Sequence, residues 1–161
     1  MRRIWMLLLL IFPASVLLAD THRVGADGKI DFSAFKTFVV REGYPTSGQP
    51  SSGNQGTKRT PDVDPRLTQS VRDALRSTFS SRGIKENPNS ADLIVNFRIE
   101  VAMHSKEVTG IVIVDLTNTA TDTIIWHGQC IDEEETSAKV EKHLPENAKK
   151  LLSEYPPKKK K

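Results

Sequence analysis

The hydrophobic positions along the chain predict four strands. Over residues 92–104 apolar and polar side chains alternate, which predicts a strand with one buried and one solvated face. Residues 108–116 are apolar on both faces and are predicted to lie centrally in a sheet. After a turn at 117–122, residues 123–131 return beside them as the second strand of a hairpin. A shorter apolar run predicts a further strand at 34–40.

Two other segments repeat their apolar residues at helical spacing. Residues 64–83 begin with an Asp-Pro pair suited to a helix start and end at Gly83, which suits the left-handed position after a helix. The stripe of this helix consists of Leu67, Val71, Ala74, Leu75 and Phe79. A second stripe runs over residues 140–155, where Pro145 must either begin the final helix or kink a longer one.

The order of these elements predicts the fold class. Strand, helix, three strands and helix indicate an α+β fold, with a mixed, mostly antiparallel sheet and two helices packed on one face. Residues 20–30 are polar, and only a turn is predicted there. Residues 41–63 contain too few apolar groups to offset their ordering entropy, so we interpret them as a mobile loop. We expect a single domain over residues 20–157.

The first residues predict export. Arg2 and Arg3 precede an apolar run that ends at the small residue Ala19, which is the order of a secretory signal peptide over residues 1–19. The run is shorter than the roughly 20 residues that a membrane-spanning helix needs. We therefore expect cleavage near Ala19 and a periplasmic or secreted protein, with an uncleaved anchor in the inner membrane as the alternative. Asp20 stands where a lipoprotein would carry its lipid-bearing cysteine.

The charge distribution argues against nucleic-acid binding. The chain has 23 Lys plus Arg and 20 Asp plus Glu, but its excess cations lie at the two ends rather than in a basic patch of the predicted domain. The basic tail consists of Lys158, Lys159, Lys160 and Lys161. Each lysine near acidic lipid contributes about 1 kcal/mol at most. We therefore expect at most a weak contact with an anionic surface.

The single cysteine, Cys130, raises the question of a cysteine-dependent enzyme. His127 lies three positions earlier on the same predicted strand, and residues three apart point to opposite faces. The two side chains are therefore not expected to meet. Cys130 is expected to share the core face with Ile124 and Trp126, where a cysteine acts as a small apolar residue.

Metal ligation has equally little support in the sequence. The other histidines, His22, His104 and His143, do not fall at the spacings typical of metal ligands. The acidic run at 132–135 could collect a hard cation, but we interpret it as the entrance of the last helix, where negative charge is favourable. We assign no catalytic, cofactor-binding or metal-binding residue and expect no enzymatic activity.

Short motifs within these elements resemble one family. They are Asp31-Phe32-Ser33, Phe35-Lys36-Thr37-Phe38, Ala91-Asp92-Leu93, Val95-Asn96-Phe97, Gly110, Val114-Asp115-Leu116, Trp126, Gly128 and Tyr155-Pro156-Pro157. Their order and spacing resemble a bacterial envelope family known only as domain of unknown function 4136. The resemblance implies an exported α+β domain without established catalytic residues, and many members look like lipoproteins. The chain departs from the family pattern at Asp20, at Asp122 in place of a turn glycine, and at Pro145.

These observations favour a non-catalytic module of the cell envelope, with an interaction or structural accessory role. Its partner would be an envelope protein or another envelope component. The expected contact surfaces are any unpaired strand edge and the solvated sheet face that carries Asn96, Arg98 and Glu100. The alternative is a periplasmic module that binds a small ligand between sheet and helices. A cysteine-dependent enzyme is the third hypothesis.

Overall fold

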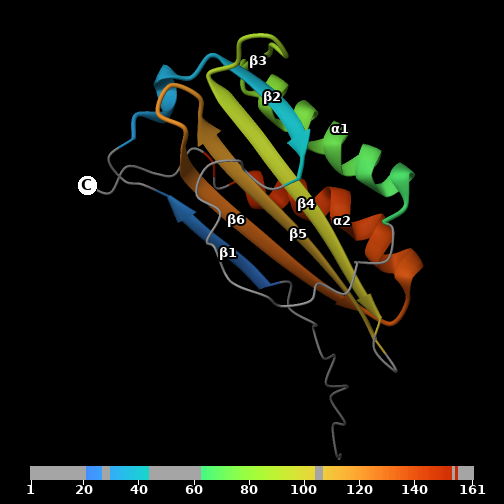
Figure 1. The fold of residues 1–161 in the computed structure, drawn as a ribbon. Coiled ribbons are helices and arrows are strands. Elements are labelled where there is room, and N and C mark those ends of the chain that lie inside the picture. The colour runs from blue at the N-terminus through green and yellow to red at the C-terminus, as the bar shows by residue number, and fades with distance from the viewer. Residues whose placement is uncertain (1–20, 27–29, 44–62, 104–106, 154, 156–161) are drawn as a thin grey trace, which may run out of the picture.

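The computed structural model describes residues 21–26, 30–43, 63–103, 107–153 and 155, in which two helices lie against one face of a sheet (Figure 1). The strands are β1 (Thr21–Ala26), β2 (Thr37–Glu42), β3 (Lys85–Glu86), β4 (Leu93–Met103), β5 (Val108–Asn118) and β6 (Thr123–Glu134). The helices are α1 (Pro65–Ser81) and α2 (Ser137–Leu152), with a 3₁₀ turn, η1 (Phe32–Ala34), before β2. The predicted signal peptide and the basic tail lie outside the described residues.

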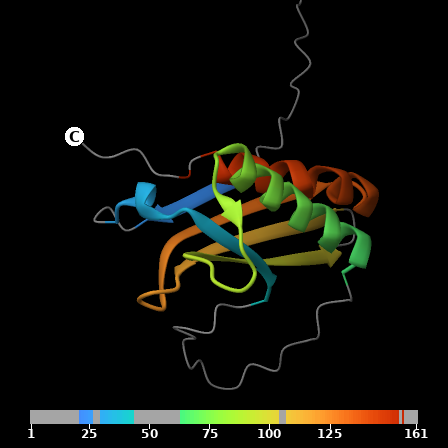
Figure 2. The ribbon, with the colours of Figure 1, turned by 90° about the horizontal axis from the view of Figure 1, so that it is seen from above.

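In the described part of the chain the strands form one six-stranded sheet in the order β1-β6-β5-β4-β2-β3. The pairs β1–β6, β6–β5 and β5–β4 are antiparallel, whereas β2 is parallel to both β4 and β3. Figure 2 shows α1 and α2 on the same side of the sheet. The predicted α+β class, with a mixed, mostly antiparallel sheet and helices on one face, is confirmed. Among the described helices, none is long and apolar enough to span a membrane.

The first strands differ from the sequence prediction. The strand expected at 34–40 begins at Thr37 instead, because Asp31 caps η1 by accepting a hydrogen bond from the Ser33 amide. The same strand continues through Glu42, so the expected loop at 41–63 began two residues too early. Residues 44–62 lie outside the described residues. Two strands were not predicted: β3 has only two residues, and β1 lies in a polar segment.

The helices follow their sequence signals closely. The Asp64 carboxylate accepts a hydrogen bond from the Arg66 amide at 2.8 Å and caps α1, and Gly83 has a φ of +78° after its last turn. Pro145 lies inside α2 and does not begin it. The expected acidic entrance of this helix is wrong: residues 132–134 extend β6, because they pair with 108–110 of β5.

The core fills the space between the sheet and the helices. One face of β4 and β5 contributes alternate residues, which pack against the apolar stripes of α1 and α2. The largest fully buried side chains are Trp126, Phe38, Phe79, Phe97, Leu75, Leu93, Leu116, Leu144, Leu151, Leu152, Val71 and Val95. The opposite face of the sheet, called the open face below, is covered by neither helix (Figure 2).

Two glycines allow α2 to approach the sheet closely. A Cβ atom on Gly110 would overlap the Val140 side chain and lie 3.2 Å from Leu144 Cδ2. A Cβ atom on Gly128 would overlap the Trp126 ring and lie 2.9 Å from Leu151 Cγ. Both glycines therefore fix the distance between β5–β6 and α2.

A β-bulge changes which residues of β6 enter the core. The register between β5 and β6 shifts at Leu116/Thr117, so that Leu116 pairs with Trp126 and Thr117 pairs with Ile124. Ile125 and Trp126 are consequently both buried, whereas Ile124 is 40% exposed. The expectation that Ile124 shares the core face with Cys130 is wrong for this reason.

Candidate functional site on the open face of the sheet

Four charged or titratable side chains from three adjacent strands meet on the open face, and we call them the charged network. They are Arg98 and Glu100 of β4, Asp115 of β5 and His127 of β6. The register brings them together, because Asp115 pairs with Asn96 on one side and with His127 on the other. Alternation along each strand then points all four side chains away from the helices.

Asp115 is the centre of the charged network. Its Oδ1 forms a hydrogen bond with His127 Nδ1 at 2.6 Å, and its Oδ2 lies 3.5 Å from Arg98 Nη1. The Asp115 side chain is 7% exposed, while those of Arg98 and His127 remain partly accessible. A buried carboxylate is stabilised only where charged or hydrogen-bonding groups surround it. Asp115 therefore holds the Arg98 guanidinium and the His127 imidazole in place on the open face.

Two further contacts lie beside Asp115 on the open face. Arg98 Nε lies 3.6 Å from Glu100 Oε1, which places a cation and an anion at neighbouring surface positions. The Asn96 amide Nδ2 donates a hydrogen bond to Thr117 Oγ1 at 3.3 Å, and both of these residues are buried. This arrangement suits recognition of a surface that carries charges of both signs.

Only part of this network was predictable from the sequence. Alternation along the strand predicts that Asn96, Arg98 and Glu100 share one solvated face, and the structure brings Arg98 and Glu100 together there. Asp115 was not predicted as a member, because residues 108–116 were interpreted as apolar on both faces. The available signal was that Asp115 is the one charged residue of this strand and follows a run of four apolar residues at 111–114.

Cys130 lies on the opposite side of the sheet from the charged network. Its side chain is fully buried, as expected for a small core residue. His127 faces the open side, so the sheet separates the imidazole from the thiol. The geometry therefore contains no cysteine–histidine pair at these two positions.

We expect the Cys130 thiol to resist modification in the folded protein, because a fully buried sulfur is inaccessible to a reagent. Intact-mass spectrometry after treatment with N-ethylmaleimide should show no adduct in native buffer and one adduct per chain in denaturant. Stoichiometric labelling in native buffer would contradict the buried position and revive the enzyme hypothesis.

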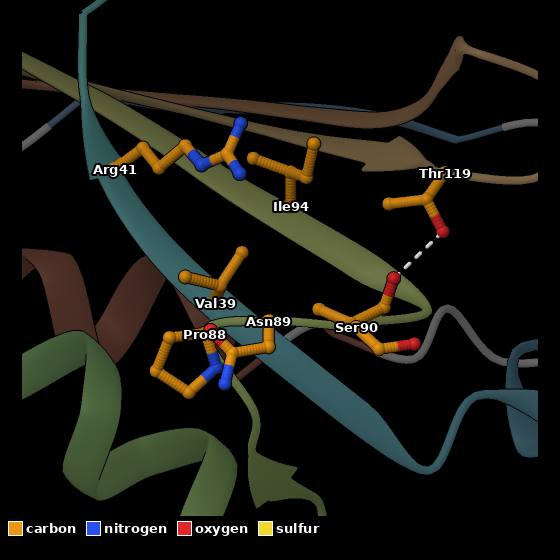
Figure 3. Close-up of a pocket in the computed structure, with 8 residues that line it drawn as sticks. Val39, Arg41, Pro88, Asn89, Ser90, Ile94 and Thr119 are labelled. Carbon is orange, nitrogen blue, oxygen red and sulfur yellow. Dashed lines mark hydrogen bonds between the residues drawn. The ribbon is translucent and has the colours of Figure 1, made fainter.

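A shallow pocket lies at the β2 edge of the open face (Figure 3). Its volume is about 300 Å³, and Val39 and Arg41 of β2, Ile94 of β4 and the 88–91 loop line it with Thr119. Thr119 Oγ1 donates a hydrogen bond to the Ala91 carbonyl at 2.7 Å, which fixes one wall. The expected position for a ligand was between sheet and helices, whereas this pocket opens on the other side of the sheet.

Asp92 has a structural role at the start of β2. Its Oδ2 accepts hydrogen bonds from the backbone amides of Lys36 at 2.8 Å and Thr37 at 2.9 Å. These hydrogen bonds, the Lys36 amide first, lower the pKa of the Asp92 carboxyl, whereas partial desolvation opposes them. The carboxylate thereby fixes where β2 joins the sheet beside β4.

Tyr155 anchors the end of the described chain in the core. Its ring packs against Phe32, Phe79 and Trp126, and burial raises the pKa of its hydroxyl to about 12. The Arg82 guanidinium donates hydrogen bonds to the backbone carbonyls of Leu152 and Tyr155. Partial burial lowers the pKa of Arg82. These contacts tie the ends of α1 and α2 together.

The remaining histidines differ in position. His104 lies outside the described residues, and His22 is described only as part of the β1 backbone. His143 of α2 lies beside two carboxylates of β6, Asp132 and Glu134, on the helix-covered side of the sheet. The sequence indicated the acidic run at 132–135 as a possible cation site, but nothing in the spacing indicated that His143 lies beside it.

Comparisons with known proteins place the chain in a family and a fold. The profile of a family described as "Domain of unknown function (DUF4136)" matches residues 23–157, whereas no curated protein matches the chain. The PelC dodecamer from Paraburkholderia phytofirmans, in space group P6, is 14% identical with a TM-score of 0.55 and covers 84% of this chain and 96% of that chain. A second crystal form, C2, of a PelC variant gives a TM-score of 0.54 at the same identity, covering 84% of this chain and 95% of that one.

A PDZ domain protein from Parabacteroides distasonis shows the same fold. It is 12% identical with a TM-score of 0.57 and covers 88% of this chain, but the match spans only 36% of that longer chain. At these identities the likeness concerns the fold alone.

Proposed function

The chain belongs to the family described as a domain of unknown function (DUF4136), and from this premise we propose that it is a non-catalytic module of the cell envelope that assembles with further copies of itself. The observation that carries the proposal is the charged network on a sheet face that neither helix covers. Two further features support it: the signal-peptide pattern of residues 1–19, and the dodecameric assembly of PelC, which has the same fold.

The charged network suits contacts between identical chains. Arg98 and Glu100 place a cation and an anion side by side on one strand, so a second copy can present the opposite order of charges. Charge complementarity of this kind sets orientation and specificity in protein interfaces. The contacts of the buried Asp115 carboxylate with Arg98 and His127 restrain both side chains, which reduces the side-chain entropy lost on association.

We expect the Arg98→Glu substitution to weaken self-association by about tenfold or more, because it sets like charges against each other across the interface. Sedimentation velocity over a range of micromolar concentrations measures this change. The exchange of both charges, Arg98→Glu with Glu100→Arg, should restore part of the association because it restores the local charge balance.

The matched control is Arg76→Glu on α1. Arg76 also forms ion pairs, with Asp73 at 3.7 Å and with Glu86 at 2.8 Å, but it lies away from the open face. We expect this variant to associate as the wild type does. The milder Arg98→Gln variant and circular dichroism show whether a lost assembly reflects the contact or the fold. An Arg98→Glu protein that is folded and associates normally would contradict the proposal.

Small-ligand binding is the second candidate, favoured by the pocket in Figure 3. Its volume of about 300 Å³ is at the lower end for ligand sites. Arg41 would favour an anionic compound there. Native mass spectrometry of the purified chain discriminates the two candidates, because a bound compound adds a small mass, whereas assembly multiplies the mass of the chain.

A further inference from the structure

The end of β6 and the second turn of α2 bring together three side chains that can bind a metal ion. Asp132 and Glu134 are two positions apart on β6, so both side chains lie on the helix-covered side. His143 comes from α2, one turn after Val140, which packs against the sheet at Gly110. Gly110 pairs with Asp132 across the strands, so the close approach of α2 at this glycine brings His143 to the carboxylates.

The distances within this cluster are those of a ligand set. His143 Nδ1 lies 2.9 Å from Glu134 Oε1 and 3.8 Å from Asp132 Oδ2. One ligand atom from each of the three residues lies within 4.8 Å of the others. A tetrahedral zinc ion with bonds of about 2.0–2.2 Å needs its ligand atoms about 3.3 Å apart. Small side-chain rotations therefore suffice to place all three atoms around one ion.

Burial adds to the case for a site at this position. The Asp132 side chain is 4% exposed, while that of His143 is 37% exposed. A buried carboxylate is costly unless hydrogen bonds or positive charge compensate it, and a divalent cation supplies such charge. The accessible imidazole gives the ion a path from solvent.

We propose that Asp132, Glu134 and His143 bind a divalent transition-metal ion, with Zn²⁺ as the reference ion. One imidazole nitrogen and two carboxylate oxygens form a donor set that suits zinc and its first-row neighbours, whereas calcium and magnesium prefer oxygen ligands alone. Nδ1 must carry no hydrogen atom when it binds the ion, so a hydrogen atom that it shares with Glu134 Oε1 moves to Nε2 of the same ring or is lost to solvent.

Lys139 competes with the ion for Glu134. Its Nζ lies 3.7 Å from Glu134 Oε2 and 3.1 Å from Glu135 Oε2. It therefore contacts the oxygen of Glu134 that His143 does not use, and it can remain with Glu135 when the ion binds. Removal of this ammonium group makes the net charge around the two carboxylates more negative, which favours binding of a cation.

The test is a zinc titration of the full chain, prepared without a histidine tag and stripped of metal with EDTA. Isothermal titration calorimetry should give one zinc ion per chain at micromolar affinity. The His143→Gln variant should bind about 100-fold more weakly or worse, because it lacks a direct ligand. The control is His127→Gln, which removes a histidine that also contacts a carboxylate, and it should bind zinc as the wild type does.

Two further measurements keep the result unambiguous. Circular dichroism shows whether His143→Gln is folded, and this partly exposed position is safer to change than the buried Asp132. The Lys139→Gln variant should bind zinc more tightly than the wild type. A wild-type chain that binds no zinc at micromolar concentrations, or a folded His143→Gln variant with unchanged zinc affinity, would overturn the proposal. Weaker zinc binding by Lys139→Gln would contradict ligation by Glu134.

Discussion

Replacement of Trp126 by alanine is expected to lower the free energy of unfolding by about 4 kcal/mol, whereas replacement of Ile124 by alanine should change it by about 1 kcal/mol or less. The two residues are two positions apart on β6 and differ because of the β-bulge. Trp126 is 1% exposed, lies against Gly128 and meets the Tyr155 ring edge-on, whereas Ile124 is 40% exposed. Removal of the Trp126 side chain leaves a large cavity beneath α2.

Urea denaturation followed by circular dichroism measures both changes, and it avoids tryptophan fluorescence, which the substitution itself alters. The comparison within one strand cancels effects of the unfolded chain that both variants share. Similar losses for Trp126→Ala and Ile124→Ala would contradict the described register of β6, since an unbroken alternation would bury both side chains.

Replacement of Gly110 by valine is expected to destabilise the fold by about 3 kcal/mol, because even a single added carbon overlaps the Val140 side chain. The strain should push α2 away from β5 and move His143 from Asp132 and Glu134. Zinc affinity should therefore fall in the same variant, measured by calorimetry below its unfolding temperature.

The control for this experiment is Gly25→Val in β1. Among the described residues other than its two chain neighbours, no heavy atom lies within 4 Å of a Cβ built on Gly25, and valine suits a strand. We expect its stability to stay within about 0.5 kcal/mol of the wild type. A Gly110→Val protein as stable as Gly25→Val would contradict the close approach of α2 at this position.

The parts of the fold that sequence could predict are those with strong periodicity. α1 carries a cap, a proline at its start and an apolar stripe, and β4 alternates along its whole length, so both were recognised. β1 was missed because its segment has little apolar periodicity and joins the sheet through backbone pairing with β6. The bulge between β5 and β6 is a property of the paired strands, and no local pattern revealed it.

The candidate sites differ in the same way in how far the sequence predicts them. Arg98 and Glu100 follow from alternation within one strand, whereas the meeting of Asp115 with His127 depends on the register of two strands. The cluster of Asp132, Glu134 and His143 required knowledge of where α2 rests on the sheet. The sequence therefore contained the residues of each site but not their proximity.

The mass of the purified protein in solution tests the central claim most directly. Multi-angle light scattering after size-exclusion chromatography gives this mass without assumptions about molecular shape. The proposed assembly through the open face predicts a defined multiple of the mass of one chain at micromolar concentration, reduced by Arg98→Glu and unchanged by Arg76→Glu. The mass of a single chain at every concentration would contradict it.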